Sequence, residues 1–191
     1  MKKEEEKYLR DVIDHFVEMY GFALTPYNRA YKTWFEHKLY GEIIIDFLKK
    51  LRVPANIRLK KCPTATIDKP HRVGTIHGIN IKSPIPFYSN QFKSLRFEIL
   101  IDPSQYEKFE IFICVLIHEL AHLVLHSTHN KYRMSEVATD LFVMSFGLYE
   151  EYDYIMRRMR KTEGYITHEQ ALYAYHYIQL KRKNANASAF A

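Results

Sequence analysis

The chain has 191 residues, of which 47% are hydrophobic and 26% are charged. This length allows one domain with a buried core, and the balance excludes an intrinsically disordered chain. The longest unbroken apolar run, residues 111–117, is far shorter than the ~20 residues that cross a bilayer, so we expect no membrane contact. The net charge of +6 would allow scattered basic clusters to form a nucleic-acid-binding surface.

The first part of the chain is predicted to be helical. Apolar residues at helical spacing indicate a helix over residues 4–20, and Gly21 offers a C-terminal stop. A second helix is expected to open near Pro26 and to be interrupted or kinked at Gly41. Residues 42–51 are expected to form a third helical stretch.

The middle of the chain has the patterns of β-strands. Alternating or β-branched runs occur at residues 57–60, 73–81 and 96–101, separated by Pro and Asn. These runs predict a small antiparallel sheet of three or four strands.

The last part of the chain is predicted to be helical again. Helices are expected over residues 105–125, 134–146, 149–161 and 168–183. We therefore predict a single α+β domain over residues 1–191. It comprises an N-terminal helical part (1–55), a core (56–183) and a flexible tail (184–191).

The helix expected over residues 105–125 carries the pattern HExxH at residues 118–122. Residues four apart in an α-helix project from one face, so His118 and His122 suit two imidazole ligands of a single Zn²⁺. Glu119 lies beside the metal, where its carboxylate can accept a proton from the attacking water and deliver it to the leaving amine. The pattern therefore predicts a zinc-dependent hydrolase with one zinc ion per chain.

A catalytic zinc ion needs a third protein ligand. His126 lies too far along a straight helix to reach the same ion, and His129 would require the chain to turn. The metzincin pattern is excluded because Thr128 stands where its third histidine would be. Glu136 is the preferred candidate, with Asp140 as an alternative ligand or as a carboxylate that orients a histidine.

The segment from Glu136 to Asp140, following HExxH, resembles the gluzincin arrangement, in which a downstream Glu is the third ligand. The stretches Glu98–Asp102 and Phe112–His126 are also similar to the ImmA/IrrE-type metallopeptidases. This resemblance implies a zincin-like fold with an active-site helix, flanking helices and peptide hydrolysis. It also implies that an extended substrate would lie antiparallel to an edge strand such as residues 95–101.

A zinc peptidase usually needs a further donor near the developing oxyanion. Candidates are the four residues that follow the motif and could line a cleft. They are Tyr132, Tyr149, Tyr165 and His168.

The leading hypothesis is thus a cytoplasmic zinc metallopeptidase that cleaves peptides or proteins, with Glu119 as general base. The small number of cysteines favours the reducing cytoplasm. Two alternatives remain open: a regulatory or nucleic-acid-associated protein that keeps the scaffold for binding, and a zinc hydrolase of non-peptide amides.

Overall fold

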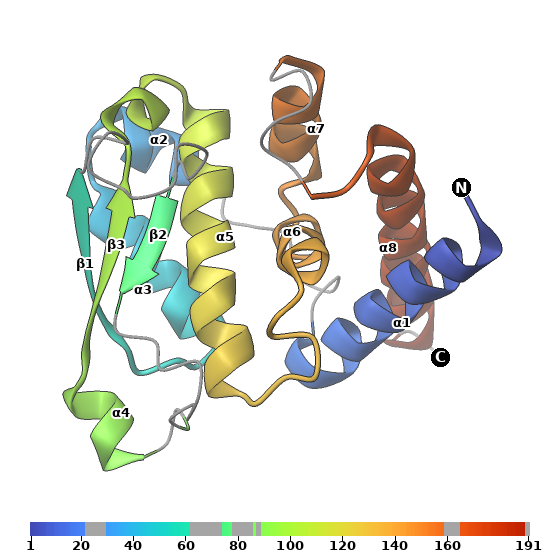
Figure 1. Ribbon diagram of the computed structural model, residues 1–191, viewed down its shortest axis with the longest axis horizontal. Coiled ribbons are helices and arrows are strands. Elements are labelled where there is room, and N and C mark those ends of the chain that lie inside the picture. The colour runs from blue at the N-terminus through green and yellow to red at the C-terminus, as the bar shows by residue number, and fades with distance from the viewer. Residues whose placement is uncertain (22–29, 62–73, 78–85, 87–88, 159–164, 190–191) are drawn as a thin grey trace. The chain divides into compact units, whose positions relative to one another are not determined.

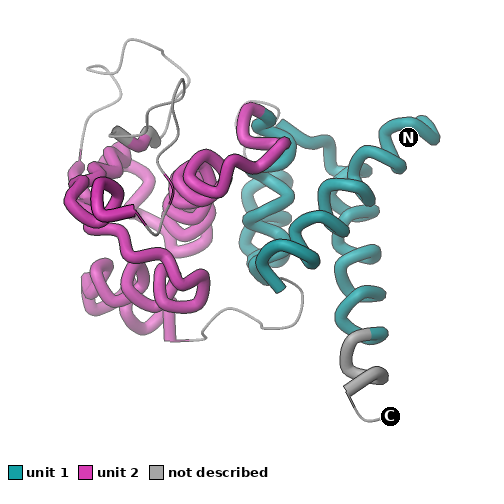
Figure 2. The backbone as a smooth tube through the Cα atoms, turned by 90° about the horizontal axis from the view of Figure 1, so that it is seen from below, with its two compact units in different colours: residues 1–27, 135–191 teal, residues 28–134 magenta. Residues whose placement is uncertain are grey.

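The computed structural model describes residues 1–21, 30–61, 74–77, 86, 89–158 and 165–189 (Figure 1). The chain divides into two compact units, shown in different colours in Figure 2. Unit 1 comprises Met1–Tyr27 and Ser135–Ala191, and unit 2 comprises Asn28–Met134. Unit 2 therefore interrupts unit 1 in the sequence.

Among its described residues, unit 2 has a three-stranded sheet in the order β1-β3-β2. Its strands are β1 (Asn56–Lys61), β2 (Gly74–His77) and β3 (Arg96–Ile101). β1 pairs with β3 in parallel, and β2 pairs with β3 antiparallel. The α+β class is thus supported, but the prediction of an antiparallel sheet is wrong for the β1–β3 pair.

The strand order explains this difference. A parallel pair needs a crossover connection of about a dozen residues or more, and the chain between β1 and β3 is much longer than that. The same order makes β3 the central strand, so the prediction that residues 95–101 form an edge strand is also wrong. The edges of the described sheet are β1 and β2.

One face of this sheet is buried and the other is more exposed. Phe97, Ile99 and Ile101 point to the buried face of β3, whereas Arg96 on the opposite face is exposed. Helix α5 (Phe109–Ser127) runs alongside the sheet and contacts β2 and β3 (Figure 1). The other short elements are α2 (Ala30–Glu36), α3 (Tyr40–Lys50), α4 (Asn90–Ser94) and the 3-10 helix η2 (Pro103–Glu107).

Gly41 does not interrupt a helix, contrary to the prediction, because it lies in the first turn of α3. The break between α2 and α3 instead falls at Lys38, whose φ of 59° is left-handed. The expected start of this helix near Pro26 and the end of the strand predicted over residues 73–81 lie outside the described residues.

An aromatic cluster fixes the beginning of α5. The Phe112 ring centroid lies 5.2 Å from that of Phe35 and 5.0 Å from those of Tyr40 and Tyr106. Burial raises the pKa of Tyr106 to about 12, and nearby Tyr40 contributes to the shift.

Helix α5 is apolar on nearly all sides, as expected of a core helix. Its length and composition would also suit a membrane span, but 78% of that apolar window is buried.

The described part of unit 1 consists of four helices. They are α1 (Lys3–Tyr20), α6 (Glu136–Ser145), α7 (Tyr149–Arg158) and α8 (His168–Ala189). Gly21 ends α1 with a φ of 62°, as predicted. Phe16 of α1 meets Phe142 of α6 edge-on at 5.5 Å, within a core that α8 extends through Ala174 and Ile178. The helix predicted over residues 168–183 extends further, because the backbone of α8 continues to Ala189.

Candidate metal centre

The two histidines of the HExxH pattern lie one turn apart on α5, as predicted. The ring centroids of His118 and His122 are 4.9 Å apart, and the ring planes are nearly perpendicular at 83°. Both side chains are half-buried. Glu119, between them in the sequence, is 7% exposed, so its carboxylate lies in a largely dry environment. Such an environment strengthens electrostatic interactions with a nearby cation.

The end of α5 explains why the next histidines diverge from this pair. The Asn130 amide donates to the carbonyl of Leu125 at 2.9 Å, and the His129 amide donates to the carbonyl of His126 at 3.1 Å. This pair of bonds is the Schellman motif that closes a helix. The residue at its left-handed position is His129, with a φ of 53°. The chain does turn at His129, and the side chain of this residue is exposed there.

Glu136 is the first residue of α6. The Ser135 hydroxyl caps this helix by accepting the Ala138 amide at 3.2 Å, and it also lies 2.8 Å from the hydroxyl of Tyr8 in α1. The Thr139 hydroxyl donates to the Ser135 carbonyl at 3.1 Å. These contacts fix the first turn of α6, on which Glu136 is presented.

His118, His122 and Glu136 form a group that could hold a metal ion. One ligand atom from each residue can be chosen so that all three lie within 4.8 Å of one another. Among the described residues, this group includes Glu136 and none of Asp140, His126 and His129. Two imidazole nitrogens and one carboxylate oxygen are a ligand set typical of catalytic zinc.

Asp140 follows Glu136 by one turn of α6 and is 3% exposed. Its Oδ2 accepts two hydrogen bonds, one from the Tyr152 hydroxyl of α7 and one from the backbone amide of Tyr165, both 2.7 Å long. Because a carboxylate oxygen buried without hydrogen-bond donors would be costly, these two bonds offset the burial of Oδ2. The sequence pointed to Asp140 but not to Tyr152.

The predicted oxyanion donors have other partners in the structure. Tyr165 is 57% exposed, and its backbone amide donates a hydrogen bond to Asp140. Tyr149 stacks on Tyr175 at 3.8 Å, and burial, then Asp153, raises its pKa. His168 Nδ1 lies 3.6 Å from a carboxylate oxygen of Asp153. The Tyr132 ring lies under the ammonium group of Lys131, at 4.9 Å from its centroid. A role for any of these four in stabilising an oxyanion stays a prediction.

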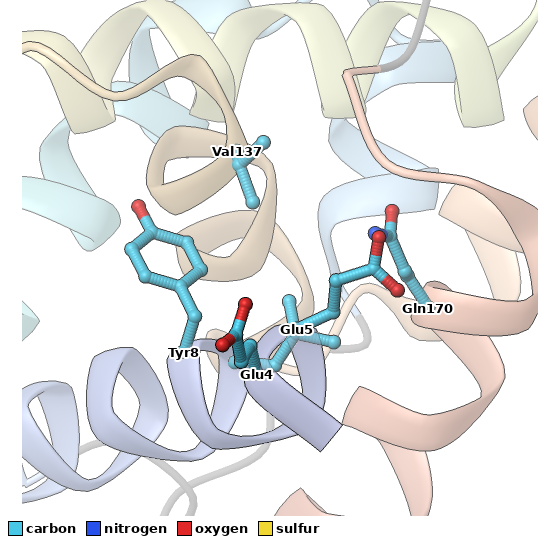
Figure 3. Close-up of a pocket in the computed structure, with 6 residues that line it drawn as sticks. Glu4, Glu5, Tyr8, Val137 and Gln170 are labelled. Carbon is cyan, nitrogen blue, oxygen red and sulfur yellow. The ribbon is translucent and has the colours of Figure 1, made fainter. Parts of the chain in front are cut away.

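Unit 1 also has an open pocket of about 270 Å³ next to the beginning of α6 (Figure 3). Figure 3 shows the carboxylates of Glu4 and Glu5 and the Gln170 amide around it. Tyr8, Leu9 and Val137 complete the lining. The pocket contains none of the residues that the sequence singled out for chemistry.

Comparisons with known proteins leave the chain without a match. No family model, no curated protein and no solved structure is significantly similar to it.

Proposed function

We propose that the protein is a zinc-dependent peptidase whose metal ligands are His118, His122 and Glu136. The observation that carries this proposal is the convergence of these three side chains to within 4.8 Å. An HExxH helix that supplied only two histidines would not make a catalytic site, since such sites usually have three protein ligands.

The three ligand atoms are of the types that zinc binds, and their spacing can be compared with that of a tetrahedral zinc site. Tetrahedral bonds of about 2.1 Å would separate the ligand atoms by roughly 3.4 Å. The three ligand atoms lie within 4.8 Å of one another, which is compatible with this spacing. All three residues are half-buried, which is compatible with access for a substrate.

A zinc ion at this site would polarise the scissile carbonyl and make a coordinated water acidic near neutral pH. Glu119 is adjacent to His118 on α5 and is largely buried. It would accept the proton of the attacking water and pass it to the leaving amine. Asp140, held by Tyr152 and the Tyr165 amide, would support a ligand histidine, because histidine ligands usually donate their second N–H to an acceptor.

The strand order restricts how an extended peptide would bind. Both sides of β3 are already paired, so a peptide cannot add to this strand. Addition of a strand by main-chain hydrogen bonds would have to use an outer edge of the sheet.

The direct test compares Glu119→Gln with Glu110→Gln. Glu110 lies in the first turn of the same helix and serves as the matched control. Zinc content is measured by metal analysis, and cleavage is measured on a mixture of unstructured peptides by mass spectrometry. We expect Glu119→Gln to keep its zinc and lose hydrolysis by at least about a hundredfold, and Glu110→Gln to keep both.

Variants of the ligands complete this test. His118→Ala and Glu136→Ala should lower zinc occupancy, since each removes one of three ligands. If Glu119→Gln cleaves as fast as the wild type, Glu119 is not the base. If His118→Ala keeps full occupancy, the metal centre itself is wrongly assigned.

A second candidate function is binding of nucleic acid by unit 2. The exposed side chains of Arg58 and Lys61 on β1 and of Arg96 on β3 favour it. The Lys60 ammonium is partly neutralised by Glu98 at 2.5 Å. Affinity for nucleic acid that falls steeply with salt and persists without zinc would support this candidate. No binding at low salt would exclude it.

A further inference from the structure

Two hydrogen bonds from distant segments hold the Asp140 carboxylate in place. The Tyr152 hydroxyl and the Tyr165 amide reach the same oxygen, Oδ2, from two different segments, α7 and the chain just before α8. Asp140 and Tyr152 are 3% and 5% exposed. Two short bonds to one oxygen of a buried carboxylate restrict rotation of its plane, because any rotation would break a charge-assisted hydrogen bond.

The restrained Asp140 carboxylate lies close to the proposed metal ligand Glu136 on α6. Asp140 lies one turn after Glu136, and residues four apart lie on the same face of a helix. The proposed third metal ligand and the restrained carboxylate are therefore neighbours along one helical face. Loss of a carboxylate that supports a metal ligand typically weakens metal binding by about 10- to 100-fold.

We propose that Tyr152 is a positioning residue of the metal centre. Its hydroxyl holds Asp140 in the orientation in which this carboxylate supports a metal ligand. This inference rests on the proposed zinc site, and it assigns a role to a residue that neither the HExxH pattern nor the metal-ligand group contains. Tyr152 acts only through Asp140, so its effect on the metal must vanish when Asp140 is altered.

The test uses the full chain and five proteins: wild type, Tyr152→Phe, Asp140→Asn, the double variant, and Tyr177→Phe. Tyr177 is the matched control because its hydroxyl donates to both carboxylate oxygens of Asp14 at 3.0 Å, in the same unit. The dissociation constant for zinc is measured by competition with a chromogenic chelator. The visible absorption spectrum of the Co²⁺-substituted protein reports the ligand geometry independently of activity.

We expect Asp140→Asn to weaken zinc binding by about 10- to 100-fold. Tyr152→Phe should weaken it less, by about 3- to 10-fold, because the Tyr165 amide still binds the same oxygen, and should alter the Co²⁺ spectrum. Tyr177→Phe should leave both unchanged. In the Asp140→Asn background, Tyr152→Phe should change the dissociation constant by less than about twofold.

A second variant keeps the test decisive if Tyr152→Phe does not fold. Tyr165→Pro removes the other donor to Oδ2, because proline has no N–H, and should change zinc affinity in the same direction. Wild-type affinity and an unchanged Co²⁺ spectrum in the folded variants would overturn the positioning role. Additive effects in the double variant would also overturn it. If the wild type binds no zinc, or if His118→Ala binds it equally well, the proposed metal centre fails and the inference fails with it.

Discussion

The left-handed conformation of His129 leads to a prediction about stability. A residue other than glycine in the left-handed conformation destabilises the folded state by about 1–2 kcal/mol. Glycine avoids this cost, but its greater freedom in the unfolded chain offsets about 0.5–1 kcal/mol of the gain in stability. His129 has a φ of 53° and an exposed side chain, so replacing it removes strain without removing core contacts. We therefore expect His129→Gly to stabilise unit 2 by about 0.5–1 kcal/mol.

The assay follows urea unfolding by the fluorescence of Trp34. This is the single tryptophan of the chain, and it lies in α2 of unit 2, which contacts α5. Its signal therefore reports on the unit that contains His129. The midpoint should rise in His129→Gly, while the slope of the transition stays constant. The variant should also keep the zinc affinity of the wild type, because His129 is not in the metal-ligand group.

Two lysine variants separate backbone strain from other effects of glycine. Lys38 is exposed with a φ of 59°, whereas Lys32 is exposed within helix α2. Lys38→Gly should stabilise the unit, and Lys32→Gly should destabilise it by about 0.5–1 kcal/mol. A lower midpoint in both His129→Gly and Lys38→Gly would refute the reasoning from left-handed strain.

Two further predictions concern the aromatic cluster at the beginning of α5. Phe112→Ala should cost about 3–5 kcal/mol of stability, since Phe112 is fully buried against three aromatic rings, and urea unfolding will measure this loss. Phe112→Leu, which keeps most of the volume, should cost much less. The raised pKa of Tyr106, about 12 against 10 in a model compound, means that the unfolded chain ionises first as pH rises. The contribution of Tyr106 to the free energy of unfolding is thus fully present below pH 10 and is lost between pH 10 and 12. The loss is less than about 1.4 kcal/mol per pH unit, because the ring is only half-buried. Tyr106→Phe should show a weaker fall in stability over that range, and an identical fall would contradict the assignment to Tyr106.

Local sequence signals were sufficient for most elements. The spacing of Leu9, Val12, Ile13 and Phe16 and the stop at Gly21 predicted α1 almost to its ends. The spacing of His118 and His122 predicted that both imidazoles lie on one face, and their ring centroids are 4.9 Å apart. These features depend on contacts within one or two turns, which is the range over which sequence patterns act.

Features that depend on distant contacts could not be predicted in this way. The pairing of β1 with β3 is decided by which strands meet after a long connection, and the strand patterns carry no information on this order. The bonds from Tyr152 and Tyr165 to Asp140 span 12 and 25 residues. The helix break predicted at Gly41 falls instead at Lys38, where a lysine occupies a left-handed position that glycine usually takes.

The interruption of unit 1 by unit 2 has a consequence for the order of events during synthesis. Helix α1 is translated before unit 2, but its apolar face packs against α6 and α8, which are translated after unit 2. Unit 2 is continuous in the sequence and can collapse in the meantime, whereas Leu9, Ile13 and Phe16 must wait for residues translated more than a hundred positions later. At about 5–20 residues per second this delay lasts roughly 6–25 seconds, during which a nascent chain would present α1 to chaperones. Chains stalled before residue 135 should therefore be recognised as incomplete by the exposed face of their first helix.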